Sequence, residues 1–281
     1  MNNREIFDKV CAATSRHTTN SFSTSFSAGV RLLAPTLRGP IHAIYGFVRF
    51  ADEIVDTFLD HPRAELLKAF ERDTWAAIEA GISLNPILHS FQQTVHRYGI
   101  EHEHIRTFLA SMEMDLHRSE HDDTSYETYI LGSAEVVGLM CLHVFCEGDR
   151  QRYDRLKPAA MRLGAAFQKI NFLRDIRDDS QRLGRSYFPG ANGAITEERK
   201  QEIEAEIRED LAAADLGISE LPIGARNGVR LASIYYKALL RKIERTPARR
   251  IREERIRISN GRKFGMLIST YLQRRFTLVL P

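Results

Sequence analysis

Two pairs of aspartates stand four residues apart in strongly apolar surroundings: Asp52 with Asp56, and Asp175 with Asp179. At 3.6 residues per turn, each pair lies on one face of a helix, with its members about 6 Å apart along the axis. Like charges this close repel each other, and burying them without compensation is costly. A divalent cation removes the conflict, and ligands that are all oxygen favour Mg²⁺ over zinc. The pattern therefore predicts magnesium binding on two helices.

The first pair shares its helical face with two other polar side chains. Tyr45 and Arg49 precede Asp52, so that the four polar residues follow one another at spacings of four, three and four. The positions between them are apolar: Ile44, Phe47, Val48, Phe50, Ala51, Ile54 and Val55. A helix that is apolar around most of its circumference is expected to be buried. We therefore predict that the polar face points into the protein.

The second pair has the same construction. Gln168 and Asn171 precede Asp175 on one face, and Arg174 adds a fixed cation beside the acids. The apolar neighbours are Phe167, Ile170, Phe172, Leu173 and Ile176. One such pair is weak support for chemistry, because solvated acidic helices often contain one. Two pairs, each on an apolar helix and each beside an arginine, favour a functional site over a purely structural helical bundle.

The chemistry that this arrangement predicts is the binding of a diphosphate. Mg²⁺ is typically held by one or two carboxylates together with substrate phosphates. Bound in this way it neutralises charge on a departing diphosphate and so assists ionisation. The carbocation left behind needs an apolar cavity that excludes water, which a largely apolar helical barrel supplies.

The elements expected around these motifs are helices throughout. Strict apolar alternation of strand length is rare in the chain, and no linker or internal repeat divides it. We predict one all-α domain over residues 1–281, with a loop over 184–193. The predicted helices span residues 41–59, 64–80, 86–98, 101–118, 125–146, 149–179, 196–215 and 224–245.

Composition narrows the class of protein. Hydrophobic residues make up 43% of the 281 residues and the net charge is +3, so no global field predicts a nucleic-acid partner. The three cysteines form no CxxC pair, which indicates a reduced, cytoplasmic setting. The apolar run Val136–Cys146 is shorter than the roughly 20 residues of a membrane-spanning helix. The sequence contains no dinucleotide fingerprint, so no NADPH is expected.

Histidines offer a second kind of metal site, which the spacing disfavours. The densest cluster is Glu101-His102-Glu103-His104. Alternate residues on a helix point in different directions, so these two imidazoles do not converge on one zinc ion. His117 with Asp115, on a Met-rich helix, is interpreted as polarity at the edge of the core rather than as a pair of ligands.

At this point the chain resembles the squalene/phytoene synthase family. Residues 44–57 resemble the family's first DxxxD motif, and residues 168–189 resemble the second with the segment behind it. Residues 23–27 resemble its N-terminal substrate-gripping segment, and residues 129–138 its small-residue tunnel helix. Further along, Tyr236, Leu239, Leu240 and residues 255–259 resemble its C-terminal signature. The resemblance implies an isoprenoid-synthase-type helical bundle around a central cavity.

The resemblance also assigns roles by position. It implies metal binding by Asp52, Asp56, Asn171, Asp175 and Asp179. The catalytic residues would be Tyr45, Arg49, Asp52, Asp56, Asp175 and Asp179. Substrate contacts would come from Phe22, Ser23, Thr24, Ser25, Phe26, Val137, Gln168, Arg174, Tyr187, Tyr236 and Arg255. The implied cofactor is Mg²⁺, with Mn²⁺ as an alternative ion.

Three features depart from the family pattern. Glu53 stands where a second aspartate is common, but it lies off the predicted inward face. The stretch 245–252 is unlike the family's usual Tyr-Asp-Val segment. Glu135 falls among the small tunnel residues, and we predict that it turns away from the substrate.

The expected reaction is the head-to-head condensation of two geranylgeranyl diphosphates to phytoene through a cyclopropyl diphosphate, the first step of carotenoid biosynthesis. The amino-acid sequences of the first motif and of the C-terminal ending most resemble those of bacterial phytoene synthases. Formation of squalene or dehydrosqualene from two farnesyl diphosphates is the alternative within the family. An alternative of another class is a non-catalytic relative that acts in assembly or binding. The oligomeric state stays open.

The C-terminal end suggests where the protein works. A basic stretch, Lys237–Lys263, is followed by a segment rich in apolar and aromatic residues, Met266–Leu280. Such a combination can lie on an anionic membrane surface, which would also receive a water-insoluble product. The competing interpretation is that this tail packs onto the domain. We therefore predict a cytoplasmic protein with peripheral contact to the inner face of the cell membrane.

Overall fold

The computed structural model describes residues 2–190 and 195–258. Within these ranges the chain is helical, and its only β-type pairing is an isolated bridge between Glu120 and Ser186. The α-helices are α1 (Asn3–Phe22), α2 (Thr24–Arg31), α3 (Pro35–Asp56), α4 (Arg63–Ala80), α5 (Pro86–Tyr98), α6 (His102–His117), α7 (Asp123–Ile130), α8 (Val136–Cys146), α9 (Arg150–Asp178), α10 (Glu197–Glu220), α11 (Ile223–Glu244) and α12 (Ala248–Ile251). Two π-helical turns, η1 (Leu131–Glu135) and η2 (Asp179–Leu183), interrupt the series. The predicted all-α fold class is confirmed.

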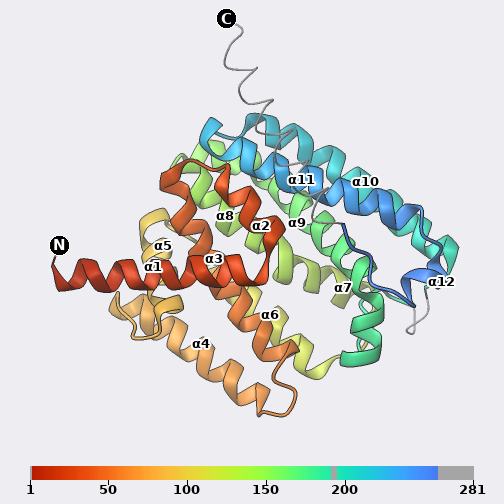
Figure 1. The fold of residues 1–281 in the computed structure, drawn as a ribbon, viewed down its shortest axis with the longest axis horizontal. Helices are drawn as coiled ribbons and strands as arrows, with labels where there is room; N and C mark the ends of the chain where they lie inside the picture. The colour runs from red at the N-terminus through yellow and green to blue at the C-terminus, as the bar shows by residue number, and fades with distance from the viewer. Residues whose placement is uncertain (1, 191–194, 259–281) are drawn as a thin grey trace, which may run out of the picture.

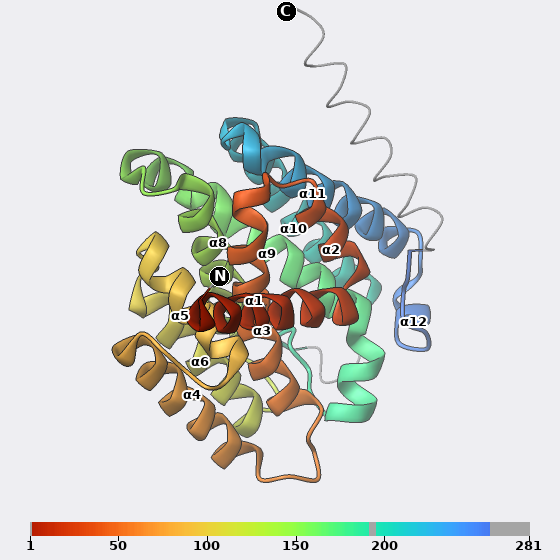
Figure 2. The ribbon, with the colours of Figure 1, turned by 60° about the vertical axis from the view of Figure 1, so that its left-hand side comes forward.

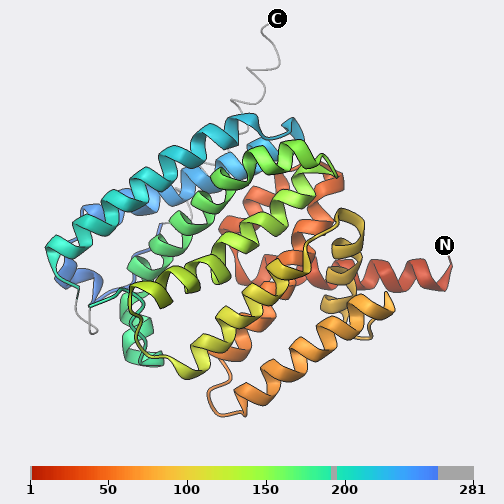
Figure 3. The ribbon, with the colours of Figure 1, turned by 180° about the vertical axis from the view of Figure 1, so that it is seen from behind.

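The helices form one bundle with the two motif helices inside it (Figure 1). α8, α9 and α10 lie side by side on the face shown in Figure 3, and α11 packs on α9 and α10. On the opposite side, the short helix α2 lies against α11, and α1 crosses α3 (Figure 2). Helices α4, α5 and α6 pack around the other flank of α3. Both α3 and α9 are therefore packed between other helices.

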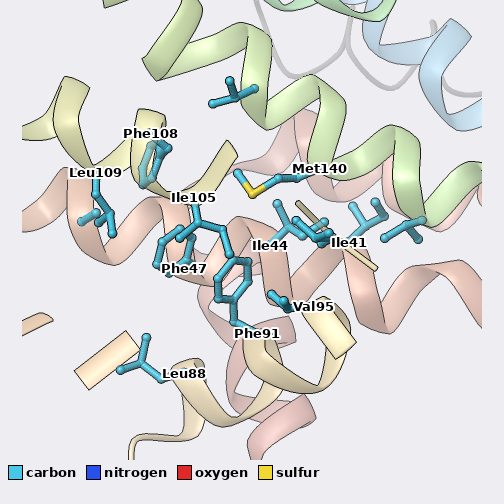
Figure 4. Close-up of a cluster of buried hydrophobic side chains, with 14 of the residues drawn as sticks. Ile41, Ile44, Phe47, Leu88, Phe91, Val95, Ile105, Phe108, Leu109 and Met140 are labelled. Carbon is cyan, nitrogen blue, oxygen red and sulfur yellow. The ribbon is translucent and has the colours of Figure 1, made fainter. Parts of the chain in front are cut away.

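An aromatic cluster fixes the position of α3 (Figure 4). Phe47 is completely buried and stacks on Phe91 of α5, with ring centroids 3.9 Å apart. Phe108 of α6 and Met140 of α8 close the cluster. Full burial of each side chain of this kind contributes roughly 2 kcal/mol to folding. The apolar side of the first motif helix thus faces the core, which leaves its polar side to face the site.

Several predicted helix ends coincide with recognisable caps. Asn85 accepts hydrogen bonds from the backbone of Ile87 and Leu88, and Pro86 occupies the first position of α5. Gly81 and Gly99, which end α4 and α5, both adopt the left-handed conformation. The residues that predicted these boundaries therefore cap the helices in the structure.

The prediction that a helix starts at residue 41 was wrong. The helix α3 begins at Pro35 and runs through Gly39 and Pro40. A residue before proline normally avoids the helical conformation because its Cβ meets the proline ring. Gly39 has no Cβ, so the helix can continue through this dipeptide. The sequence-based list of helices also omitted α1 and α2, and it ended α10 five residues early.

The tunnel helix is longer than the apolar run within it. Helices α7, η1 and α8 continue one another over Asp123–Cys146, and together they pass a length and composition test for a membrane-spanning helix. The prediction that rested on the length of Val136–Cys146 alone was therefore wrong. More than half of its most apolar window, 56%, is buried inside the protein. Burial of this kind is that of a core helix. The tail on which membrane contact was predicted lies outside the described residues from Ser259 onwards.

Candidate active site

A cavity runs between α2, α3, α8, α9, α10 and α11 and encloses about 1640 Å³ of atom-free space, part of it open to solvent. One end, here called the polar end, is lined by Ser23, Ser25, Tyr45, Ser133, Gln168, Asn171, Arg174 and Tyr236. The other end, here called the apolar end, is lined by Leu142, Phe145, Leu156, Leu221 and Val229.

The first aspartate motif lies on α3 at the polar end. Arg49 donates to Asp52 at 2.8 Å and also to Glu53. The Arg49 guanidinium lies 4.4 Å from the centroid of the Phe22 ring, a cation–π contact. Burial, with the nearby charge of Asp56, raises the pKa of Asp52 to about 7. One arginine therefore balances a carboxylate that is crowded by another.

Arg185 connects the two motifs. It follows η2, is only 5% exposed, and donates to the Asp56 carboxylate at 2.5 Å. Its other donors reach the backbone oxygens of Val55 and Asp115 at 3.0 and 2.9 Å. The segment after the second motif is thereby tied to the C-terminal end of α3.

Behind Arg185 lies a buried carboxylate. Asp115 of α6 accepts hydrogen bonds from Tyr129 at 2.6 Å and from Tyr187 at 3.1 Å. Its carboxylate lies 3.5 Å from the Arg185 guanidinium. Burial raises the pKa of Asp115 to about 6, against the opposing effect of Arg185. Tyr187 also stacks on Phe172, with centroids 4.2 Å apart. Tyr187 therefore lies behind the carboxylates rather than in the cavity wall.

The second aspartate motif lies at the end of α9 and the start of η2. Asp175 pairs with Arg174 and with Arg255, whose Nε lies 2.7 Å from the carboxylate. Asp179 is desolvated and close to Asp175 and Asp56, and its pKa rises to about 8. The interaction of Asp179 with Asp56 shows that the acids of the two motifs lie near each other. The structure thus brings together all four motif aspartates.

A chain of amides and hydroxyls continues from the second motif into the cavity. Tyr236 donates to Asn171, and Asn171 donates to Gln168, each at 3.3 Å. Gln168 in turn donates to Ser133 at 3.3 Å. Tyr236 also stacks on Phe167, with centroids 3.8 Å apart. These contacts hold three predicted site residues in fixed positions on the cavity wall.

The predicted N-terminal substrate segment is only partly in the cavity. Ser23, Ser25 and Phe26 line it, and Phe26 stacks on Tyr45 with centroids 4.8 Å apart. Burial raises the pKa of Tyr45 to about 12, so this hydroxyl stays protonated. Phe22 and Thr24 are exposed and lie outside the lining.

Two positions of the tunnel helix face in opposite directions. Val137 lines the cavity, whereas Glu135 is absent from the lining and interacts with Asp210, Lys169 and Arg162 on α9 and α10. The structure therefore turns Glu135 away from the cavity, as predicted.

The donor set of the two motifs fits magnesium. It is made only of oxygens, and two of its carboxylates have raised pKa values, chiefly because burial desolvates them and also because neighbouring carboxylates crowd them. A divalent cation would relieve that crowding. Among residues 2–190 and 195–258, no three acidic, histidine or cysteine side chains converge closely enough to hold a metal ion by themselves. Mg²⁺ held by these motifs would therefore take further ligands from phosphates and water.

Three functional residues were missed from the sequence: Asp115, Tyr129 and Arg185. Asp115 was set aside as polarity at the edge of the core, although the buried side of its helix is mostly apolar. Arg185 and Tyr129 stood in quoted motifs, but nothing in their spacing pointed to Asp115. A buried acid in an apolar helix face was the one signal that could have raised the question.

Comparison with known proteins decides the family. The family model for squalene/phytoene synthase matches residues 19–262. The chain belongs to this family. The match spans both aspartate motifs and every helix that lines the cavity. The predicted family membership is confirmed.

Individual relatives lie within the same family. The chain is 26% identical over 273 residues to a 15-cis-phytoene synthase from Paracoccus sp., covering 87% of this chain and 86% of that protein. It is 32% identical over 182 residues to a presqualene diphosphate synthase from Sinorhizobium fredii, covering 63% and 62%. A chloroplastic phytoene synthase from an Oncidium hybrid cultivar is 27% identical over 247 residues, which cover 79% of this chain. The chain spans only 58% of the length of that relative.

A solved structure shows the same fold. A dehydrosqualene synthase in complex with a ligand superimposes with a TM-score of 0.80, covering 95% of this chain and 98% of the other. The two sequences are 17% identical. The isoprenoid-synthase-type bundle implied by the sequence is therefore confirmed as a fold.

Proposed function

We propose that the protein is a magnesium-dependent prenyltransferase that joins two geranylgeranyl diphosphates head-to-head to form phytoene. In the first step, the C1–O bond of one substrate breaks, and the double bond of the other captures the resulting cation. Loss of a proton gives a cyclopropyl diphosphate. In the second step, this compound loses its own diphosphate, rearranges and loses another proton. The first step releases one diphosphate and the second step releases the other.

One observation carries the proposal: the two acidic motifs lie close to each other beside the polar end of a long, mostly apolar cavity, next to the lining residues Tyr45, Asn171 and Arg174. A diphosphate needs cations, and a prenyl chain needs apolar walls. The geometry offers both along a single axis. A binding or assembly protein would have no need of four crowded aspartates, two of which, Asp52 and Asp179, are desolvated at a cost in free energy. This cost favours a catalytic role over the non-catalytic alternative.

The residues of the polar end take separate roles in this reaction. The four motif aspartates would hold Mg²⁺, which, when bound, acts as a Lewis acid on the departing diphosphate. Arg49, Arg174 and Arg255 lie beside those carboxylates and would bind diphosphate oxygens. Tyr45, protonated and stacked, supplies a hydroxyl at the start of the cavity. The apolar wall beyond excludes water from the cation.

The length of the cavity supports a C20 substrate. Ser133 and Phe145 both line it from the same helix, and at 1.5 Å per residue they are about 18 Å apart along the axis. An extended chain advances about 1.2 Å per bond. By the same measure, a geranylgeranyl main chain is about 18 Å long and a farnesyl main chain about 13 Å. The geranylgeranyl chain therefore matches the length of this wall.

The second candidate is condensation of two farnesyl diphosphates. It is favoured by the similarity to the presqualene diphosphate synthase at 32% identity, which exceeds the identity to the phytoene synthases. That match covers less of the chain, 63% against 87% for the Paracoccus protein. Formation of a reduced squalene product would in addition require a hydride donor.

Product analysis distinguishes the candidates. The purified protein is incubated with Mg²⁺ and either C15 or C20 prenyl diphosphate, with and without NADPH, and extracts are analysed by liquid chromatography and mass spectrometry. The proposal predicts a C40 hydrocarbon from the C20 substrate, without any need for NADPH. A C30 product alone would favour the farnesyl candidate, and no product with either substrate would reject the enzymatic proposal.

A further inference from the structure

The direction of the helices defines which residues close the cavity. Along the tunnel helix, Ser133 lies at the polar end and Phe145 lies in the last turn of α8. Helix α9 returns in the opposite direction, so its lining residues run from Leu156 to Arg174, back toward the polar end. Leu221 at the end of α10 meets Leu156 at the same place. The apolar end is therefore where α8 stops and α9 starts.

Phe145 is the largest side chain at that end. The others that line it there are leucines and a valine: Leu142, Leu156, Leu221 and Val229. Phe145 packs against two separate hydrophobic clusters, one around α3 and α6 and one around the α8–α9 turn. It thus lies at the seam between the clusters, in the cavity wall at the apolar end.

Cys141 and Val137 lie one and two turns nearer the polar end on the same helical face. Both are small, so the wall stays open up to Phe145. We propose that Phe145 is the stop that sets the longest prenyl chain this site accepts: it admits a C20 chain and excludes a C25 chain. The inference rests on the proposed function. Its physical basis is length, because one more isoprene unit adds four bonds, about 5 Å, which would overlap the Phe145 ring.

The test measures binding rather than turnover. The full-length protein with Mg²⁺ is titrated by calorimetry with thiolodiphosphate analogues of C15, C20 and C25 chains, whose C–S bond ionises poorly. The wild type is expected to bind the C20 analogue at least tenfold more tightly than the C25 analogue. In Phe145→Ala this ratio is expected to fall to threefold or less. Phe145→Leu, which keeps more of the packing, is expected to lower the ratio at least threefold.

A second variant moves the stop instead of removing it. Cys141→Phe places a ring about 6 Å nearer the polar end, and it fills open space rather than packed core. We expect C20 binding to weaken at least tenfold relative to C15 binding. The matched control is Val144→Ala on the same helix, because Val144 is buried in the core and does not line the cavity. This control should leave both ratios unchanged.

The outcomes separate the two proposals. If the wild type binds the C20 analogue tightly but Phe145→Ala, Phe145→Leu and Cys141→Phe all keep the wild-type ratios, the assignment of Phe145 is overturned and the proposed function stands. If the wild type binds none of the three analogues, the proposed function fails and this inference fails with it. Shifts in the Val144→Ala ratios equal to those of Phe145→Ala would likewise overturn the assignment, because packing alone would then explain them.

Discussion

The two ends of the cavity differ in what surrounds their ionisable groups. At the polar end, burial raises the pKa of Asp52 to about 7, but Asp52, Asp56 and Asp175 each form an ion pair with an arginine. Toward the apolar end, burial keeps ionisable groups neutral: it lowers the pKa of His143 to about 4 and raises that of Cys141 to about 12. Cys141 and His143 lie about 12 and 15 Å beyond Ser133 along the helix. One chain therefore pairs charge in one place and excludes it from another.

This difference has a chemical reason. A buried charge needs a partner, and each partner must be supplied by a neighbouring helix. The polar end draws its arginines from α3, α9 and the segments that follow η2 and α12. No such partner is needed along a wall that contacts only hydrocarbon. The boundary between the ends is also the boundary between the diphosphate and the chain in the proposed complex.

The largest expected effect comes from breaking the polar end. Asp52→Ala and Asp175→Ala should each lower kcat/KM by about 1,000-fold, because each removes a carboxylate from a motif that would hold metal against the diphosphate. The far-ultraviolet circular dichroism should stay helical, since loss of one crowded carboxylate relieves repulsion. The control is Asp73→Ala, an exposed residue of α4 paired with Arg72. Near-normal turnover in either motif variant would contradict the assignment.

The next largest effect is expected from breaking the connection that Arg185 makes between the two motifs. Arg185→Met should lower kcat/KM by about 100-fold and the free energy of unfolding by about 3 kcal/mol, because it leaves the buried Asp115 carboxylate without its cation. Arg182→Met, at an exposed position of η2, is the matched control. Urea unfolding and steady-state kinetics measure both effects. A variant that loses turnover but keeps full stability would show that Asp115 does not depend on Arg185.

The polar end was predictable wherever its partners lie on one helix. The i, i+3 and i, i+4 spacings of Tyr45, Arg49 and Asp52 are properties of any helix, so the structure placed these residues together as expected. The pairing of Arg185 with Asp115 joins residues 70 positions apart. Helical spacing in the sequence does not predict a contact between residues so far apart, because the contact forms only when the helices pack together.

Other errors came from local signals that tertiary context overrode. Glu53 was given little weight because it lies off the inward face, yet it binds Arg49 and its side chain is only 14% exposed. Gly39 and Pro40 were interpreted as helix breakers, yet the pair lies inside α3. The apolar end offered only leucines, a valine and a phenylalanine, which are typical of any core. Its role depends on empty space, which a sequence does not describe.

A smaller effect, on stability, is expected when a methyl group is added at Gly164 in the cavity wall. An added Cβ at Gly164 would lie 2.6 Å from the backbone oxygen of Ala134, where η1 crosses α9. Backbone cannot move aside as a side chain can, so Gly164→Ala should lower the free energy of unfolding by about 1–3 kcal/mol. Thermal and urea unfolding measure the change. Ser219→Ala, at an exposed position of α10, should stay within about 0.5 kcal/mol of wild type. An unchanged stability in Gly164→Ala would mean that the two helices can separate at this crossing.

The smallest expected effect concerns His143, which lies toward the apolar end, where burial keeps ionisable groups neutral. The His143 ring packs at a tilt against Tyr153, with centroids 4.1 Å apart, and burial lowers the pKa of His143 from 6.5 to about 4. Below pH 6.5 the unfolded chain therefore binds a proton that the folded chain does not, so stability falls as the pH falls toward 4. His143 should account for a loss of about 1 kcal/mol between pH 7 and pH 5.5. Urea unfolding across this range should show a shallower slope in His143→Gln than in wild type, whereas His61→Gln, at an exposed position, should keep the wild-type slope. Equal slopes in wild type and His143→Gln would mean that His143 becomes charged inside the fold, and the contrast between the two ends would then not extend to this residue.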